Sequence, residues 1–158
     1  EAIDPRDIGG ATENVHFLEN FPRPLEYKND SYHKEFNKLM NVDNVYAKEK
    51  GTGKVMAKSH CWQSYENFFA LKAAIEKAGW KTKKDTSEVV KALEGLEMKN
   101  SLAHPQGSKT LRAEDHSGMI DCYISKVENS KFVLKKKIPR DEMEKMLPPR
   151  YDFRKQSL

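Results

Sequence analysis

The residues that could do chemistry in this chain are its histidines, its cysteines and one short acidic stretch. The five histidines lie at positions 16, 33, 60, 104 and 116, and no two have the i, i+4 spacing that places two metal ligands on one helix face. The run Glu114–Asp115–His116 offers groups for acid–base work, although charged residues in a polar loop more often form solvated surface. No Gly-x-Ser-x-Gly motif accompanies a Ser-His-Asp set. We therefore expect no enzyme, no metal site and no cofactor.

The sequence GTGK at positions 51–54 is reminiscent of a phosphate-binding loop. The full pattern G-x-x-x-x-G-K-[ST] requires Gly at position 48 and Ser or Thr at position 55. The chain has Lys48 and Val55 at these places, so the motif is rejected.

The two cysteines, Cys61 and Cys122, are too few for a disulfide scaffold and the wrong number for a structural zinc site. They either remain thiols or form one bond that closes a long loop, and their spacing does not decide between the two.

The composition excludes several classes of protein. Of the 158 residues, 37% are hydrophobic and 33% are charged, which makes a thin core for a free-standing domain. The net charge of +4 is spread over mixed charges without a basic stripe and interleaved aromatics, so we expect no nucleic-acid partner. No apolar run approaches the roughly 18 residues of a transmembrane helix. The opening EAIDPRDIGG lacks a starting Met and an apolar leader, which favours a mature or excised segment.

The first elements expected along the chain are a strand, a stiff connector and a helix. Val15, Phe17 and Phe21 alternate along a strand within positions 11–22. Prolines at 22 and 24 forbid a helix and stiffen an extended connector. Apolar residues then recur at helical spacing over 31–40, with Asp30 or Ser31 as the N-cap.

The middle of the chain predicts two helices. The stretch SHCWQSYENFFALKAAIEKAG begins at position 59, and its apolar spacing predicts a helix over 62–78 that Gly79 ends. Its head is aromatic, which raises the question of whether these rings only pack the core or also line a pocket. Phe68 and Phe69 are interpreted as packing. A second helix is predicted over 87–96, capped by Asp85 or Thr86.

The last third predicts strands and a closing helix. One short strand is expected at 110–112, and MIDCYISKV (119–127) and KFVLKKKIP (131–139) flank a hairpin turn. A short helix over 140–147 precedes a tail that drapes over a surface. Helices and strands are therefore mixed, and the predicted fold class is α/β.

Several of these segments together resemble a known family. The stretches FFALKAAIEKAG (68–79), TSEVVKALEGLEM (86–98) and LRAEDHSGMIDCYISKVENSKFVLKKKIP (111–139) are similar to the C-terminal part of type I periplasmic binding proteins. The nearest subgroup is the branched-chain amino-acid-type solute receptors of ABC importers. HFLENFPRPLEYKNDSYHKEFNKLM (16–40) resembles the strand, crossing and helix that lie just upstream in that family. The match runs in order over nearly the whole chain, but residues 41–61 fit loosely.

The resemblance implies a two-lobe fold whose lobes close over a solute in the cleft between them. Residues 1–23 would end the second lobe, 24–121 would form part of the first lobe, and 122–158 would return to the second lobe and form the tail. The chain would contribute strands and helices to both lobes and complete neither, so the N-terminal remainder of the same receptor is an expected partner. Crossings between the lobes would fall at Pro22, Arg23 and Pro24 and at Asp121 and Cys122.

The resemblance also implies where a solute would bind. The segment that enters the helix at position 62 would arrive at the cleft, where Trp62 would cover the apolar part of a solute, and core packing is the alternative role for this indole. Polar or additional contacts would come from Ser59, His60, Gln63 and Tyr65.

The implied function is that of a periplasmic or otherwise extracytoplasmic solute-binding protein of a bacterial ABC importer, possessing no chemistry of its own. Its solutes would be amino acids, small amides or aromatic acids, and its partners the solute and a membrane permease. A lipid anchor at the N-terminus is compatible with this class. The alternative is a ligand-sensing regulatory domain of the same fold.

Overall fold

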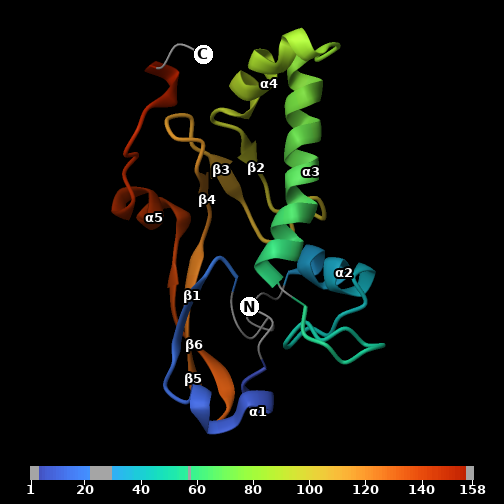
Figure 1. Ribbon diagram of the computed structural model, residues 1–158, viewed down its shortest axis with the longest axis vertical. Coiled ribbons are helices and arrows are strands. Elements are labelled where there is room, and N and C mark those ends of the chain that lie inside the picture. Colours follow the sequence, from blue (N-terminus) through green and yellow to red (C-terminus); the bar gives the residue numbers. More distant parts are fainter. Residues whose placement is uncertain (1–3, 22–29, 57, 156–158) are drawn as a thin grey trace.

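A computed structural model describes residues 4–21, 30–56 and 58–155 of the chain. The helices are α1 (Pro5–Ile8), α2 (Ser31–Leu39), α3 (Lys58–Ala78), α4 (Thr86–Leu93) and α5 (Arg140–Met146), with 3-10 turns η1 (Gly9–Thr12), η3 (Lys83–Asp85) and η4 (Phe153–Lys155). The strands are β1 (His16–Glu19), β2 (Glu97–Met98), β3 (Lys109–Leu111), β4 (Gly118–Met119), β5 (Cys122–Glu128) and β6 (Lys131–Ile138). In Figure 1, β1, β5 and β6 lie on one side and α3 stands upright on the other, with β2, β3 and β4 between them. The fold class is α/β, as the sequence predicts.

The first sheet joins the two ends of the chain. β5 is its central strand and pairs antiparallel with β1 on one edge and with β6 on the other. Val127 and Phe132 point inward from the hairpin and pack with Phe17 of β1 and with Tyr46. The N-terminal segment and the C-terminal hairpin therefore form one unit, while the proposed division of the chain into lobes remains a prediction.

The predicted hairpin between β5 and β6 is confirmed. Asn129 and Ser130 both have positive φ, at 51° and 58°, which is the signature of the type I′ turn that matches the twist of paired strands. The carboxylate of Glu13 accepts the backbone N–H groups of Asn129 and Ser130 at 3.0 and 3.4 Å. The turn is thus fixed by its own backbone and by the N-terminal segment.

The long helix α3 begins four residues before the predicted start and ends where Gly79 predicts. Gly79 has φ of 64°, and the N–H groups of Gly79 and Trp80 donate to the carbonyls of Glu76 and Ile75, which closes the helix in a Schellman arrangement. The interpretation of Phe68 as packing is wrong, because its side chain is 76% exposed. Phe68 lies on the helix face opposite the core.

The helix α4 packs on α3 through small and branched side chains. Ala74 of α3 meets Val89 and Ala92 of α4 in a buried cluster. The predicted capping by Asp85 takes another form, since its carboxylate accepts the backbone N–H of Thr82 at 2.9 Å and makes a capping box for η3 instead. The helix also ends earlier than predicted, before Gly95 with its φ of 70°.

The second sheet is short and follows the helices. β3 is central and pairs antiparallel with β2 and β4. The strand predicted at 110–112 is confirmed with a shift of one residue, as Lys109–Leu111.

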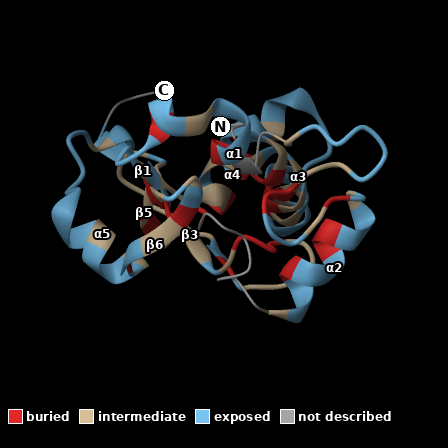
Figure 2. Cartoon of the chain, turned by 90° about the horizontal axis from the view of Figure 1, so that it is seen from below, coloured by how far each residue is buried: buried red, intermediate tan, exposed pale blue. Residues whose placement is uncertain are grey.

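The largest core cluster surrounds Trp62. The indole is fully buried among Phe21, Phe36, Val42 and Ala47. Figure 2 shows buried residues on the sides of α2 and α3 that face the interior, whereas α5 is largely exposed. This cluster ties α2 and the start of α3 to the segment just past β1.

Candidate binding cavity

A cavity of about 240 Å³ lies between α3 and the second sheet, just past the end of β1. Residues 63, 67 and 70 of α3 face it together, as the i, i+4, i+7 spacing of a helix requires. Its walls are formed by Asn20, Gln63, Asn67, Ala70, Met98, Gln106, Lys109, Leu111, Gly118 and Ile120. Amide and amine groups thus share the cavity with aliphatic side chains, so it offers both polar and apolar contacts.

A buried carboxylate organises the polar side of the cavity. Glu66 of α3 is only 1% exposed and accepts the backbone N–H of Gln106 at 2.6 Å. It also pairs with the ammonium of Lys109. Lys109 donates in addition to Oε1 of Gln106 at 3.1 Å. These contacts hold the loop before β3 against α3.

The amide nitrogen of Gln106 is the least satisfied group in this wall. The side chain is 3% exposed, and its Nε2 has no hydrogen-bond partner among the described residues. A buried donor without a partner carries a desolvation cost. The nitrogen is closed off from solvent, so this donor lies behind the surface of the cavity wall.

The charges at the cavity wall compensate each other. Lys109 and Glu66 are both largely removed from water and form a direct ion pair. Breaking such a pair leaves an uncompensated charge, which is strongly unfavourable. The wall is therefore polar but close to neutral.

The cavity also adjoins the chain segment that leads into the first sheet. Asn20 accepts a hydrogen bond from the thiol of Cys122 through its Oδ1 at 3.3 Å. Burial, with a smaller contribution from the charge of Asp121, raises the pKa of the Cys122 thiol. Asp121 itself accepts the backbone N–H of Arg140 at 2.9 Å and pairs with Lys137 at 2.6 Å. Cys61 and Cys122 are not joined by a disulfide.

The structure places the predicted site residues in different environments. Gln63 lines the cavity, whereas His60 is exposed at the start of α3. Trp62 lies in the core and packs against other apolar side chains. Core packing is the alternative role that we considered for this indole from the sequence. Tyr65 is partly buried and packs on Phe36, and burial raises the pKa of its phenol. A contact between Trp62 and a solute stays a prediction.

Other predicted positions lie outside the described residues. Pro22, Arg23 and Pro24 fall in the undescribed segment 22–29, and the side chain of Ser59 is also outside the description. Asp121 and Cys122 are described, and they lie where β4 passes into β5. The role of these six residues in hinge motion or binding remains a prediction.

Sequence reasoning missed Glu66, Gln106 and Lys109. The burial of Glu66 could have been inferred from its spacing, because it lies one helical turn after the buried Trp62 and one before the buried Ala70. A carboxylate on an apolar face needs a partner. Nothing in the sequence indicates that the partner is Lys109, which is 43 residues away.

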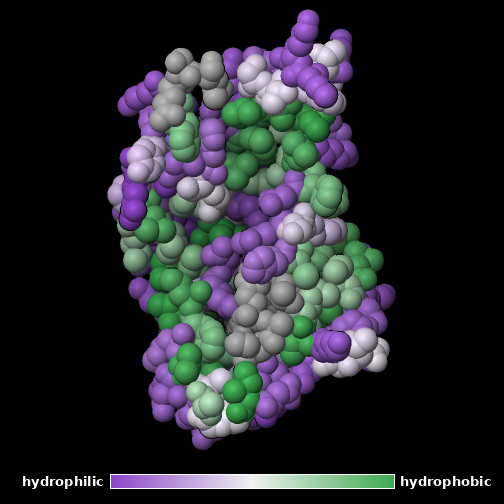
Figure 3. Space-filling model, in the orientation of Figure 1, coloured by the Kyte–Doolittle hydropathy of each residue, from purple (hydrophilic) through white to green (hydrophobic). Residues whose placement is uncertain are grey.

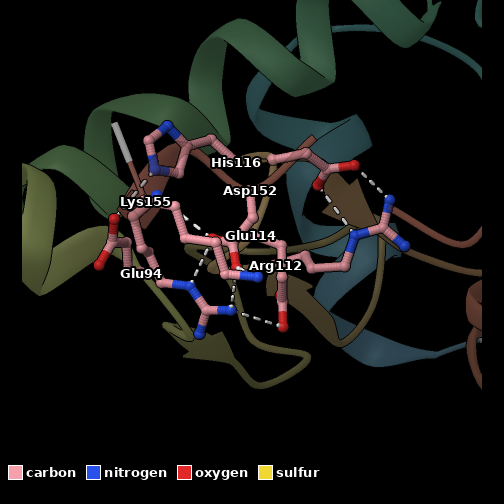
Figure 4. A network of polar contacts seen from close by, with 8 residues as sticks. Glu94, Arg112, Glu114, His116, Asp152 and Lys155 are labelled. Atoms are coloured by element: carbon pink, nitrogen blue, oxygen red, sulfur yellow. Dashed lines mark hydrogen bonds and ion pairs between the residues drawn. The ribbon is translucent and has the colours of Figure 1, made fainter. Parts of the chain in front are cut away.

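The acidic run before His116 forms a polar network around the C-terminal tail (Figure 4). Arg112 binds Asp115 through two bonds of 2.8 and 2.5 Å, and His116 lies 3.1 Å from Glu94. The Arg112 guanidinium holds the pKa of the Asp115 carboxyl well below its usual range. The side chains of residues 114–116 thus have a structural role, because they hold neighbouring segments together through hydrogen bonds and ion pairs.

The tail is attached to the same network. Arg154 pairs with Glu114 at 3.3 Å and with Asp152 at 2.8 Å, and the backbone N–H of Phe153 donates to the carbonyl of Glu114 at 2.7 Å. Within residues 4–21, 30–56 and 58–155, no cluster of three or more His, Cys, Asp or Glu side chains could hold a metal ion. In the same ranges no helix is both long and apolar enough to cross a membrane.

Comparison with known proteins supports the fold. No protein-family model matches the sequence, and a search of curated proteins finds no match. Among solved structures, the chain is similar to a leucine-binding protein, LivK, from Thermotoga maritima, with a TM-score of 0.55 and 19% sequence identity. The likeness covers 87% of this chain and 35% of that one, so the chain spans about a third of the solved structure. The fold therefore matches part of the type I periplasmic-binding-protein fold.

Proposed function

We propose that the chain is part of an extracytoplasmic solute-binding receptor of an ABC importer. The supporting fold likeness is to a leucine-binding protein, and the observation that carries the proposal is the cavity between α3 and the second sheet. Concave sites with convergent polar groups and an apolar wall are the usual form of a small-molecule site. Its solutes would be amino acids, small amides or aromatic acids.

Binding would stabilise a closed arrangement of two lobes. Asn20 reaches the cavity from just past the end of β1. Its side-chain Oδ1 accepts a hydrogen bond from the thiol of Cys122, at the start of the central strand of the first sheet. A solute that contacts Asn20 and Lys109 together would favour the conformation in which both are close. The connector 22–24 and the passage at Asp121 and Cys122 are the proposed hinge.

The N-terminal remainder of the same receptor is the proposed structural partner. Phe68 and Leu71 lie one turn apart on α3 and are exposed, and Figure 3 shows a large hydrophobic area beside α3 and α4. Exposed apolar patches of this kind are typical of surfaces that pack against another part of a protein. A permease in the membrane is the proposed second partner, and a bacterial periplasmic or other extracytoplasmic location follows from this role.

The receptor would bind its solute without converting it. The acidic run at 114–116 is occupied by ion pairs with Arg112 and Arg154, which leaves it a structural role. A turnover screen with hydrolase and transferase substrates tests this part of the proposal, and measurable catalysis would reject it.

The proposal is tested by calorimetric titration of the protein with a panel of L-amino acids, small amides and aromatic acids. We expect saturable binding of at least one class, together with a rise in the melting temperature that grows with solute concentration. The variant Gln63→Ala removes a side-chain amide from the cavity wall and should weaken binding. Absence of binding across the whole panel would contradict the proposal.

A further inference from the structure

We propose that a groove between the C-terminal tail and β4 binds a medium-chain carboxylate, the anion of an unbranched aliphatic acid. This site is separate from the cavity beside α3 and does not depend on the proposed solute-binding function. Three features carry the proposal: a tail that is fixed at both ends, an exposed apolar wall, and one arginine without an ionic partner.

The tail is anchored on both sides of the groove. In Figure 1 it leaves α5 and runs beside the loop between β3 and β4. At one end, the guanidinium of Arg112 donates to the backbone carbonyl of Leu147 at 2.5 Å. At the other end, the backbone N–H of Phe153 donates to the carbonyl of Glu114 at 2.7 Å. The hollow is therefore held open by fixed contacts with the loop.

The stretch between the two anchors is stiff, and the groove has the size of a ligand site. Pro148 and Pro149 each fix one backbone dihedral angle, which limits collapse of the tail onto β4. The groove has a volume of about 610 Å³, within the range of roughly 300–1,000 Å³ that is usual for small-molecule sites.

The wall of the groove is mostly apolar and open to solvent. Met146, Leu147 and Tyr151 are each at least half exposed, and all three line the groove together with Phe153 and with Met119 of β4. Exposed apolar side chains that gather around one hollow mark a binding surface. Methionine side chains adapt their shape to a flexible chain, so this wall suits an alkyl group.

The groove carries one uncompensated positive charge. Arg112 and Asp115 both line it, and they neutralise each other through two bonds of 2.8 and 2.5 Å. Arg150 also lines the groove and is exposed, and no described residue forms a hydrogen bond or ion pair with its side chain. The nearby carboxylate of Asp152 already pairs with Arg154 at 2.8 Å.

This charge selects a monoanion with an apolar chain. A guanidinium can bind a carboxylate through two parallel N–H groups, while the alkyl chain covers the exposed wall. A dianionic phosphate would bring a surplus charge against apolar side chains, which is unfavourable. A cation would meet Arg150, and the one carboxylate that lines the groove in the described part of the chain is already paired with Arg112.

Three probes of equal chain length test the class of the head group: hexanoate, 1-hexanol and hexylammonium. Binding to the 158-residue chain is followed by NMR through the labelled methyl groups of Met119 and Met146, which line the groove. We expect hexanoate to bind at least about fivefold more tightly than 1-hexanol, the ratio that an ion pair at the surface produces, and hexylammonium to bind most weakly.

A second series tests the apolar wall. Octanoate should bind about tenfold more tightly than butyrate, because four additional CH₂ groups are partly removed from water. Benzoate should bind more weakly than octanoate. If benzoate bound as tightly, or if affinity did not rise with chain length, the assignment to an alkyl chain would be wrong.

The variant Arg150→Gln isolates the charge. It should lower the affinity for hexanoate about fivefold and leave that for 1-hexanol unchanged. Lys145→Gln is the matched control, because Lys145 is also an exposed cation near the tail but does not line the groove, and it should leave both affinities unchanged. Equal losses for the two variants would show that only the net charge of the protein matters.

Met146→Ser tests the same groove without changing its charge. It should weaken hexanoate and 1-hexanol by similar factors, reported by the methyl group of Met119. Hexanoate that leaves both methionine signals unchanged would overturn the proposal. If hexanoate instead shifted the side-chain amides of Gln63 and Asn67, it would bind in the cavity beside α3, so the groove would be rejected while solute binding would stand.

Discussion

Glu66 is the single residue on which the geometry of the cavity most depends. It connects α3 to the loop before β3 through the backbone of Gln106 and the ammonium of Lys109. Gln106 and Lys109 lie 40 and 43 residues away from Glu66 in the sequence. Their hydrogen bonds to this buried carboxylate are directional, so they fix the orientation of the loop against α3. The polar wall of the cavity depends on this carboxylate, because it holds Gln106 and Lys109 against α3.

Glu66→Ala should lower the free energy of unfolding by about 3 kcal/mol, because it leaves Lys109 and the Gln106 N–H without their buried partner. Urea denaturation measures the change. The matched control is Glu76→Ala on the same helix, where Glu76 pairs with Lys72 at 3.5 Å on an exposed face. That loss should be about 0.5 kcal/mol or less. Equal losses for both variants would show that Glu66 has no special structural role.

Asp152 in the tail should titrate far below an ordinary aspartate. Its hydrogen bond to Arg154 is the main cause, with Lys155 contributing, and together they lower its pKa to about 2 against opposition from partial burial. Because the folded pKa is depressed, the stabilisation is present above the unfolded pKa of about 4 and is lost as the pH falls toward 2. Carboxyl-carbon NMR measures the pKa, and Arg154→Gln should return it toward about 4. A native value already near 4 would mean that the tail is not held by this pair.

At the scale of elements, the sequence indicates the helices and strands well and their contacts poorly. Period-2 alternation predicts β5 and β6, and helical spacing with a terminal Gly79 predicts α3, because these signals are local. The family resemblance assigned residues 1–23 and 122–158 to one lobe, but the pairing of β1 with β5 was not predicted, because no local signal specifies which strands pair. Phe68 shows the limit of composition, since a large apolar residue in a helix was interpreted as core and is exposed.

The candidate site shows the same division. Gln63 was predicted and lines the cavity, because it lies on α3 next to the aromatic positions that mark the helix. Gln106 and Lys109 lie in an irregular loop and at the start of a short strand, where no periodicity indicates direction. Only the fold brings them to α3.

The hairpin of β5 and β6 should gain stability from Ser130→Gly. Ser130 has φ of 58°, a conformation that costs L-residues energy and that glycine adopts freely. Asn-Gly is the favoured pair in a type I′ turn, so we expect an increase of about 0.5–1 kcal/mol in the free energy of unfolding, measured by urea denaturation. Ser130→Val should act in the opposite direction. If the valine variant were as stable as the glycine variant, the turn would not have this conformation.

At the scale of the whole molecule, the chain matches part of the type I periplasmic-binding-protein fold and exposes large apolar side chains such as Phe68. Phe68→Ala should change the free energy of unfolding of the 158-residue chain by less than about 0.5 kcal/mol, because the side chain is 76% exposed. Phe36→Ala is the matched comparison and should cost about 3–5 kcal/mol, since Phe36 is fully buried.

The same pair of variants tests the proposed N-terminal partner. In a receptor that contains the N-terminal remainder, Phe68→Ala should become distinctly more costly than in the chain alone, because the remainder would cover this face of α3. An unchanged small effect in the longer protein would place the partner surface elsewhere.

The most direct test of solute binding is an NMR titration that follows the side-chain NH₂ groups of Gln63, Asn67 and Gln106 during addition of each solute of the panel. These amides line the cavity from two walls, and a bound solute must change their environment. We expect saturable shifts of all three groups with one common dissociation constant for at least one solute. Unchanged amide signals, or shifts confined to the tail around Phe153, would contradict it.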